Sequence, residues 1–224
     1  MITWIQIGIQ DSNSPIMEEF SFFHDYIMVT LIFIISNVLG LICFLYKNNK
    51  ISKMASEHQY LETVWTLIPA LILINLAIPS LSLLYILEED LEHSISVKTL
   101  GHQWYWSYEL REVPSAPTFD RYMLTQNTED GGARLIEVDN RLTLPFGSSI
   151  KVLISSIDVL HSWTVPSLGV KADACPGRLN QVRIMGTRPG VFFGQCSEIC
   201  GANHRFMPIV VEIVSIKDFI RWAL

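Results

Sequence analysis

Residues 26–46 read Tyr-Ile-Met-Val-Thr-Leu-Ile-Phe-Ile-Ile-Ser-Asn-Val-Leu-Gly-Leu-Ile-Cys-Phe-Leu-Tyr and contain no Asp, Glu, Lys or Arg. A second uncharged stretch covers 63–87. A helix crosses the hydrocarbon core of a bilayer with about 20 apolar residues, so the two stretches predict membrane-spanning helices. Burial inside a soluble protein is the alternative, but a chain of 224 residues is too short to surround two such helices.

The charges between the apolar stretches predict how the chain is divided. We expect an outward-facing N-terminal segment at 1–25, transmembrane helices at 26–46 and 63–87, an inner loop at 47–62, and one outer domain at 88–224. The loop carries Lys47, Lys50 and Lys53, whereas 1–25 contains no Lys or Arg. The positive-inside rule therefore places the loop on the cytoplasmic or matrix side and both termini on the opposite side.

Local signals refine the two helices. Ser14 followed by Pro15 reads as an N-cap and a first helical residue, so the first helix is expected from about Pro15 through Tyr46. The second helix contains Pro69 and Pro79. Each proline removes an internal hydrogen bond, which predicts kinks.

After residue 87 the sequence changes to short β-rich pieces separated by turn residues. Strands are expected at 95–100, 135–138, 150–155, 182–185, 191–194 and 209–214, and Trp104-Tyr-Trp106 is also expected on a strand. Turn signals include Gly131-Gly132, Pro145-Phe146-Gly147, Pro176-Gly177 and Pro189-Gly190. This pattern predicts an antiparallel sandwich or barrel, closed by a short helix after Ser215.

The charge balance limits the partners. The formal net charge is −6, with 22 acidic and 16 basic residues. A nucleic-acid partner is disfavoured, because binding phosphates requires a basic face. A basic protein partner of the outer domain is favoured instead.

The most informative stretch is Gly194-Gln-Cys-Ser-Glu-Ile-Cys-Gly-Ala-Asn-His-Arg-Phe-Met-Pro208, in which Cys196, Cys200, His204 and Met207 have the spacing C-x3-C-x3-H-x2-M. Thiolate, imidazole and thioether ligands suit copper, and Met is the weak axial ligand of copper electron-transfer sites. A second imidazole is available from His161. Two cysteines can bridge two copper ions, which leaves one coordination position for a backbone carbonyl of the loop.

Three other interpretations of this loop stay open, and the weakest of them is that the spacing arises by chance. A Cys2His2 zinc site would leave Met207 without a role, because structural zinc takes nitrogen and thiolate donors. A disulfide between Cys196 and Cys200 is the remaining interpretation.

The chain resembles the family of mitochondrial cytochrome c oxidase subunit 2, the copper-carrying subunit of haem-copper terminal oxidases. The resemblance runs along the whole chain and is carried by the motifs at 14–19, 62–66, 101–108, 137–141, 159–163 and 176–181 and by the metal loop. It implies a two-helix transmembrane hairpin followed by an all-β cupredoxin-like Greek-key barrel holding the dinuclear copper centre CuA. A quinol-oxidase subunit 2 that lost the copper is disfavoured, because all five side-chain ligands are present.

The family pattern also implies the ligand assignments. Cys196 and Cys200 would bridge both copper ions, His161 and Met207 would complete one ion, and His204 with the backbone carbonyl of Glu198 would complete the other. The side chain of Glu198 resembles a ligand to a magnesium ion shared with subunit 1. From spacing alone, the same side chain would be a solvated loop carboxylate.

The resemblance further implies routes for electrons and protons. Trp104 matches the family's entry residue for electrons from cytochrome c, although aromatic residues at alternate strand positions often fill a barrel core. Glu62 resembles the residue at the mouth of a proton pathway, and its alternative role is a helix-end carboxylate at the membrane interface.

Glu109, Asp139 and Asp158 resemble acidic docking positions for cytochrome c, although each is individually more typical of a solvated surface. Two residues depart from the family pattern. Ile157 stands where many relatives have an acidic residue, so docking is expected to be weaker or rearranged. Cys175 has no functional account, and a buried thiol is its simplest interpretation.

The expected function follows from this resemblance. The chain would accept electrons from reduced cytochrome c at CuA and pass them to subunit 1, where oxygen is reduced to water with proton pumping, in a complex with other oxidase subunits. The expected location is the mitochondrial inner membrane, with both termini and the CuA domain in the intermembrane space. A stand-alone membrane-anchored copper carrier or chaperone is the alternative, and a nitrous-oxide-reductase-like protein, which lacks this hairpin, is a third class.

Overall fold

A computed structural model describes residues 6, 8–50, 57–89, 92–111, 118–124 and 134–223. The chain divides into two compact units, one formed by 1–18 with 89–224 and the other by 19–88. Lys53 of the predicted inner loop and the predicted turn at Gly131-Gly132 lie outside the described residues.

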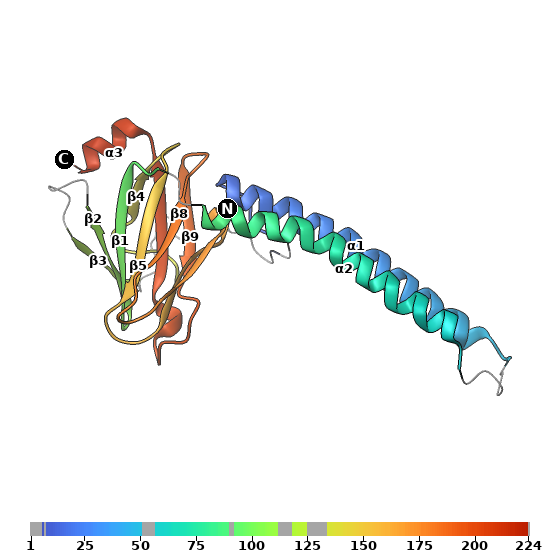
Figure 1. The fold of residues 1–224 in the computed structure, drawn as a ribbon. Helices are drawn as coiled ribbons and strands as arrows, with labels where there is room; N and C mark the ends of the chain where they lie inside the picture. The colour runs from blue at the N-terminus through green and yellow to red at the C-terminus, as the bar shows by residue number, and fades with distance from the viewer. Residues whose placement is uncertain are drawn as a thin grey trace. The chain divides into compact units, whose positions relative to one another are not determined.

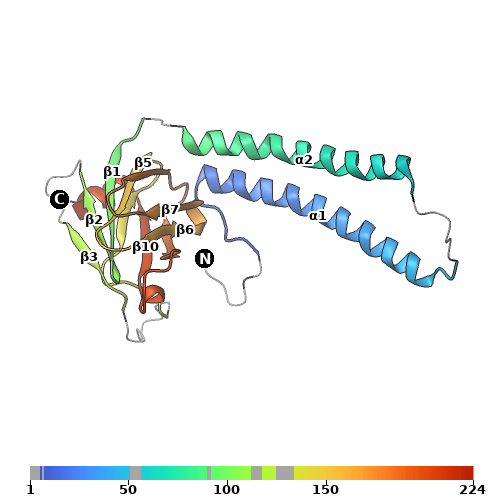
Figure 2. The ribbon, with the colours of Figure 1, turned by 60° about the horizontal axis from the view of Figure 1, so that its bottom comes forward.

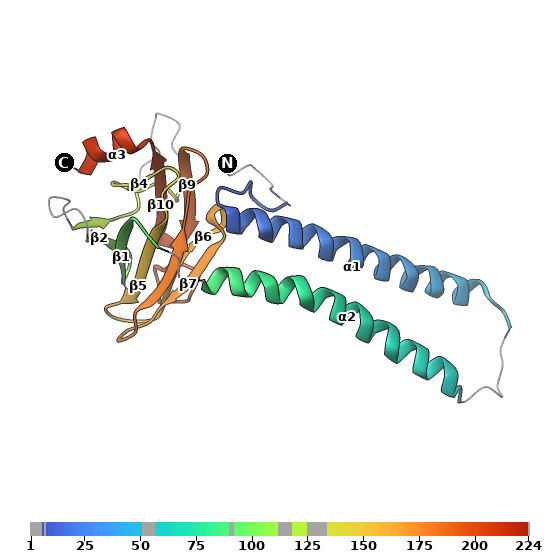
Figure 3. The same ribbon diagram turned by 45° about the horizontal axis from the view of Figure 1, so that its top comes forward.

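The two apolar stretches form two long helices, as predicted. Helix α1 covers Pro15–Lys47 and α2 covers Gln59–Glu88, and their most apolar windows have mean hydropathies of 2.6 and 2.2. The helices run side by side in opposite directions (Figures 2 and 3). Almost none of those apolar windows is buried within the chain, 0% for α1 and 6% for α2. Side chains of this kind require lipid or other membrane helices around them.

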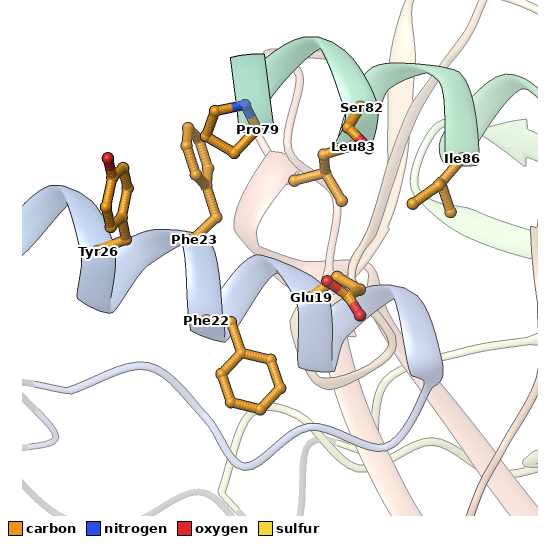
Figure 4. Close-up of a pocket in the computed structure, with 8 residues that line it drawn as sticks. All are labelled: Glu19, Phe22, Phe23, Tyr26, Pro79, Ser82, Leu83 and Ile86. Carbon is orange, nitrogen blue, oxygen red and sulfur yellow. The ribbon is translucent and has the colours of Figure 1, made fainter. Parts of the chain in front are cut away.

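Side chains of α1 and α2 contact one another within the hairpin. Asn75 donates a hydrogen bond to the Tyr26 hydroxyl, which links the two helices. Figure 4 shows Phe23 of α1 turned toward Pro79 of α2, beside a groove of about 230 Å³. Pro69 and Pro79 both lie inside α2, so neither proline ends the helix. The predicted kinks stay a prediction.

The start of α1 is fixed by its cap. The Met17 N–H donates to Ser14 Oγ at 3.0 Å, which confirms Ser14 as the N-cap. Ser14 Oγ in turn donates to the Leu168 carbonyl at 2.8 Å, and the Asn13 N–H donates to the Ser167 carbonyl at 2.7 Å. These bonds tie the residues before the membrane helix to the β domain.

The β domain contains ten strands among the described residues (Figure 1). Their bounds are β1 Ile95–His102, β2 Tyr105–Leu110, β3 Phe119–Arg121, β4 Leu142–Pro145, β5 Ile150–Ser156, β6 His161–Val165, β7 Val170–Ala174, β8 Asn180–Ile184, β9 Gly190–Gln195 and β10 Pro208–Val214. Short 3-10 helices cover Pro166–Leu168 (η1) and His204–Phe206 (η2), and α3 covers Ile216–Ala223. The Asp218 N–H donates to Ser215 Oγ at 3.2 Å, so the predicted closing helix is confirmed together with its cap.

The strands form a mixed arrangement, and the prediction of a purely antiparallel domain was wrong. Sheet orders are β3-β2-β1-β5-β8, β4-β10-β9 and β6-β7. β1 pairs with β5 in parallel, and β4 pairs with β10 in parallel. Parallel neighbours far apart in sequence require long crossing connections, which local patterns do not reveal.

Two local predictions were also wrong. Residues 135–138 form a turn and an isolated bridge between Val138 and Met123, because Leu135 adopts a φ of 64° that no strand accommodates. Trp104 lies in the turn between β1 and β2 and not on a strand. Its neighbour Trp106 is on β2 and is 0% exposed, so Trp106 is the aromatic side chain that fills the core.

Candidate metal centre

The predicted metal ligands lie together at one end of the β domain. The loop 196–207 joins β9 to its antiparallel neighbour β10, and it lies at the end of β10 opposite α3 (Figure 1). The Ser197 N–H donates to the Ser162 carbonyl at 3.1 Å, which holds this loop against the start of β6. His161, the first residue of β6, therefore lies beside Cys196, 35 residues later in the chain.

The two cysteines are placed to share a metal. Their Sγ atoms lie 4.0 Å apart, and both thiols are free and buried, so the structure does not contain the alternative disulfide. Thiolate–metal bonds of about 2.3 Å allow an ion between these sulfur atoms to contact both. His161 Nδ1 is 3.9 Å from Cys196 Sγ, and the ligand atoms of His161, Cys196 and Cys200 all lie within 4.8 Å of one another.

The remaining predicted donors surround the sulfur pair. His204 Nδ1 and Met207 Sδ each lie 3.5 Å from Cys200 Sγ. The Glu198 carbonyl oxygen lies 3.3 Å from Cys196 Sγ. Met207 is only 1% exposed, and its thioether is directed at the cluster. A zinc site would leave this sulfur unused, so the donor set fits a pair of copper ions better.

The surroundings of the two thiols shift their pKa values in opposite directions. Burial alone would raise the pKa of Cys196, but hydrogen bonds with His161 and with the backbone at Glu198 and Ser162 lower that pKa to about 7. Burial and the adjacent Cys196 thiolate raise the pKa of Cys200. The two thiols are therefore expected to lose their protons in separate steps, and a bound metal would displace any proton that remains.

His161 is held from its other side by Asp158. The His161 Nε2 lies 2.8 Å from Asp158 Oδ1. Burial lowers the pKa of His161, but the hydrogen bonds with Cys196 and Asp158 outweigh that effect and raise it. For Asp158, partial burial raises the pKa, and the hydrogen bonds from His161 and from the Val159 and Gln103 N–H groups lower it overall.

Glycine allows the backbone to approach this site closely. A Cβ at Gly101 would lie 2.8 Å from His161 Cδ2, and a Cβ at Gly194 would lie 1.8 Å from the Thr164 carbonyl oxygen. Both positions therefore require the absence of a side chain, so that the strands can pack against β6.

Trp104 contacts the loop directly. Its Nε1–H donates to the Cys200 carbonyl at 3.2 Å, and Gln103 Nε2–H donates to the same oxygen at 2.8 Å. The indole is half-buried. The turn between β1 and β2 is thus attached to the backbone of a cysteine in the cluster.

Among the described residues, the predicted docking residues Glu109 and Asp139 and the predicted proton-pathway residue Glu62 make no contact with the cluster. Glu109 pairs with Lys98 at 3.5 Å, and Asp139 Oδ1 accepts the Tyr122 N–H at 3.0 Å. Glu62 is in the first turn of α2. The departures from the family pattern are an exposed Ile157 and a half-buried, free Cys175.

The contacts of Gly101 and Gln103 with the residues of the predicted metal centre were not predicted. Both residues belong to the motif at 101–108, in which only Trp104 was assigned a role. The spacing of Asp158 and His161 was a further signal, because a carboxylate often orients a metal-binding histidine.

Comparison with known proteins decides the family. A model of the cytochrome c oxidase subunit II periplasmic domain matches 95–214, and a model of the transmembrane domain of the same subunit matches 2–83. The chain belongs to the cytochrome c oxidase subunit II family. Its two apolar helices therefore anchor it in a membrane, and its β domain is the cupredoxin-like domain of subunit II.

Members of the subunit II family resemble this chain over nearly its full length. Cytochrome c oxidase subunit 2 of Sympetrum striolatum is 52% identical over 223 residues, covering 99% of this chain and 97% of the relative. The Drosophila melanogaster protein is 50% identical with the same coverage. The crystal structure of the periplasmic domain of subunit II from Bradyrhizobium japonicum is 39% identical, with a TM-score of 0.55, and the match covers 59% of this chain and 93% of that domain. A copper electron-transfer role is consistent with this family.

Proposed function

We propose that this chain is the electron-entry subunit of a cytochrome c oxidase. It accepts electrons from reduced cytochrome c at a dinuclear copper centre, CuA, and delivers them to subunit 1, where oxygen is reduced to water with proton pumping. The observation that carries the proposal is the convergence of two cysteine sulfurs, two imidazoles, a thioether and a backbone carbonyl at one end of the barrel. The names of its relatives support a place in an oxidase with other subunits.

In this proposal, the two copper ions would be held by Cys196 and Cys200 together, with His161 and Met207 on one ion and His204 and the Glu198 carbonyl on the other. When bound, the copper pair would supply one-electron redox chemistry. The contacts of the sulfur atoms with all four other donors support the assignment.

The protein's part is to hold these donors in place and to bury His161 and Met207. His161 is 0% exposed and Met207 is 1% exposed. Within the loop, the Phe206 N–H donates to the Asn203 carbonyl at 2.8 Å and the His204 N–H donates to the Gly201 carbonyl at 3.2 Å. Donors held in this way move little when the charge at the site changes, so electron transfer requires little reorganisation.

Trp104 receives electrons from cytochrome c in this proposal, and Glu109, Asp139 and Asp158 attract the basic donor. The hydrogen bond from Trp104 to the Cys200 carbonyl supports the entry role, because it connects the indole to the backbone of the cluster. The formal charge of −6 supports electrostatic attraction.

Two further sites belong to the proposal. The Glu198 side chain, half-buried in the same loop, would bind a magnesium ion shared with subunit 1. Glu62, in the first turn of α2, would stand at the entrance of a proton pathway. A carboxylate at the start of a helix is also favoured by the helix dipole, so the position alone does not require the pathway.

The proposed location is the mitochondrial inner membrane, with 26–46 and 63–87 crossing it and 47–62 facing the matrix. Residues 1–25 and the CuA domain at 88–224 would lie in the intermembrane space. The lysines of the connecting loop support this topology. Protease treatment of sealed vesicles from the intermembrane side should digest the outer domain and spare 47–62.

Stopped-flow mixing of the assembled oxidase with reduced cytochrome c tests the function. Cys196→Ser should abolish rapid haem reduction, because it removes a bridging sulfur. Cys175→Ser is the matched control, since Cys175 is a free cysteine of the same domain outside the cluster. Equal rates in the two variants, or purification of the chain without haem-bearing subunits, would refute the proposal.

A further inference from the structure

Asp158 stands between the copper ligand His161 and the turn that carries Trp104. Its Oδ1 lies 2.8 Å from His161 Nε2, and its Oδ2 accepts the Gln103 N–H at 2.7 Å. We propose that Asp158 is a positioning residue whose single carboxylate fixes both the imidazole of a copper ligand and the turn of the entry tryptophan. This inference rests on the proposed function.

The parallel pairing of β1 with β5 creates this arrangement. Gly101 is opposite Ser156, so both strands end at the same edge of the sheet. The Ile157 N–H donates to the Gly101 carbonyl at 3.1 Å, which carries the pairing one residue past β5. Asp158 then lies beside Gln103, although 55 residues separate the two in sequence.

The contact with His161 fixes how the imidazole is presented. A neutral imidazole that donates from Nε2 to the carboxylate has its lone pair on Nδ1, which is the nitrogen nearest Cys196 Sγ. The carboxylate itself is held, because its Oδ1 also accepts the Val159 N–H at 2.6 Å. Asp158 thus selects the tautomer and ring orientation that a metal at Nδ1 requires.

The contact with Gln103 fixes the tryptophan turn from the opposite side. Gln103 donates its backbone N–H to Asp158 and its side-chain Nε2–H to the Cys200 carbonyl. Trp104 donates to that same carbonyl. The turn is therefore attached both to the segment before His161 and to the metal loop, and a change at Asp158 should disturb both ends.

Asp158 makes more hydrogen bonds than a carboxylate needs if it acts by its charge alone. The Asp158 side chain is 31% exposed, and both of its oxygens accept hydrogen bonds. Glu109 is 46% exposed, and its carboxylate pairs with Lys98, another surface side chain. A docking role requires only charge, whereas a positioning role also requires the length and both acceptor atoms of the aspartate.

Three variants of the assembled oxidase separate these roles: Asp158→Glu, Asp158→Asn and Glu109→Gln. The measurements are the EPR and absorption spectra of the copper, the KM for cytochrome c, and the rate of electron injection at saturating cytochrome c. Asp158→Glu keeps the charge but displaces the carboxylate, and Asp158→Asn keeps the shape but offers one acceptor oxygen. Both should shift the copper spectra and slow saturated injection about tenfold. Glu109→Gln should raise the KM and leave the spectra unchanged.

The inference is overturned if Asp158→Glu matches the wild type and Asp158→Asn changes only the KM, as Glu109→Gln does. If Asp158→Asn fails to assemble, the spectra and injection rate of Asp158→Glu decide the question alone. Failure of the proposed function is distinguishable, because the wild-type oxidase itself would then lack the copper signal.

Discussion

At the scale of single residues, Met207 indicates most clearly that the site is suited to copper. Its sulfur lies 3.5 Å from Cys200 Sγ in a side chain that is 1% exposed. An apolar side chain of similar size would fill the same space, so the fold does not require the thioether. The proposed copper centre gives a reason for its position, because a thioether is a weak ligand suited to copper.

Met207→Leu should therefore change the copper centre more than the fold. Volume-conserving swaps of this kind usually cost less than about 1.5 kcal/mol of stability. We expect a shifted reduction potential and an altered absorption spectrum, measured on the assembled oxidase, with a nearly unchanged melting temperature. A spectrum identical to that of the wild type would contradict a ligand role for Met207.

The number of protons released when copper binds should depend on pH. The Cys196 pKa is lowered to about 7 and the His161 pKa is raised, so both groups hold more protons as the pH falls through neutrality. Copper binds the deprotonated forms. Loading the copper-depleted protein should thus release more protons per metal at pH 6 than at pH 8, measured by calorimetry in buffers of different ionisation enthalpy. A pH-independent release would contradict the lowered thiol pKa.

At the scale of elements, the parts specified by local sequence were predicted correctly. The apolar runs, the cap at Ser14 and the closing helix after Ser215 each depend on residues close in sequence. The ligand role of the loop 196–207 stays a prediction. The misplaced strand at 135–138 had suitable side chains, but Leu135 adopts a φ of 64°, which lies outside the strand region. The parallel pairings and the hydrogen bond from the Gln103 N–H to Asp158 join distant segments, and no local pattern contains them.

The cap at Ser14 offers a test at this scale. Ser14→Ala removes the acceptor of the Met17 N–H and the donor to the Leu168 carbonyl. Loss of an N-cap costs about 1 kcal/mol, so hydrogen exchange at the start of α1 should accelerate several-fold. Ser215→Ala, which removes the cap of α3, should accelerate exchange only in α3. Equal exchange at Met17 in the wild type and in Ser14→Ala would show that the cap adds nothing.

At the scale of the whole molecule, a membrane-anchored chain combines the proposed copper-binding loop with a net negative charge. The formal charge is −6, and electrostatic attraction is screened over a Debye length of about 8–10 Å at physiological salt. Association with a basic donor should therefore weaken as salt is added.

Turnover with cytochrome c should show this dependence. Raising the ionic strength from about 0.01 to 0.15 M shortens the Debye length from about 30 to 8 Å, so the KM for cytochrome c should rise several-fold. Electron injection after binding should change little. A KM that is independent of ionic strength would refute electrostatic docking by the acidic residues, and the exposed Ile157 would then indicate an apolar contact.

The central claim is that the loop 196–207 and His161 together hold two copper ions that share one electron. Its most direct test is the copper content of the purified oxidase, measured together with the EPR hyperfine pattern of the oxidised form. The account predicts two copper ions at this centre in each chain and an unpaired electron spread over both nuclei. A single copper ion with one-nucleus hyperfine structure, or an EPR-silent zinc ion, would contradict it.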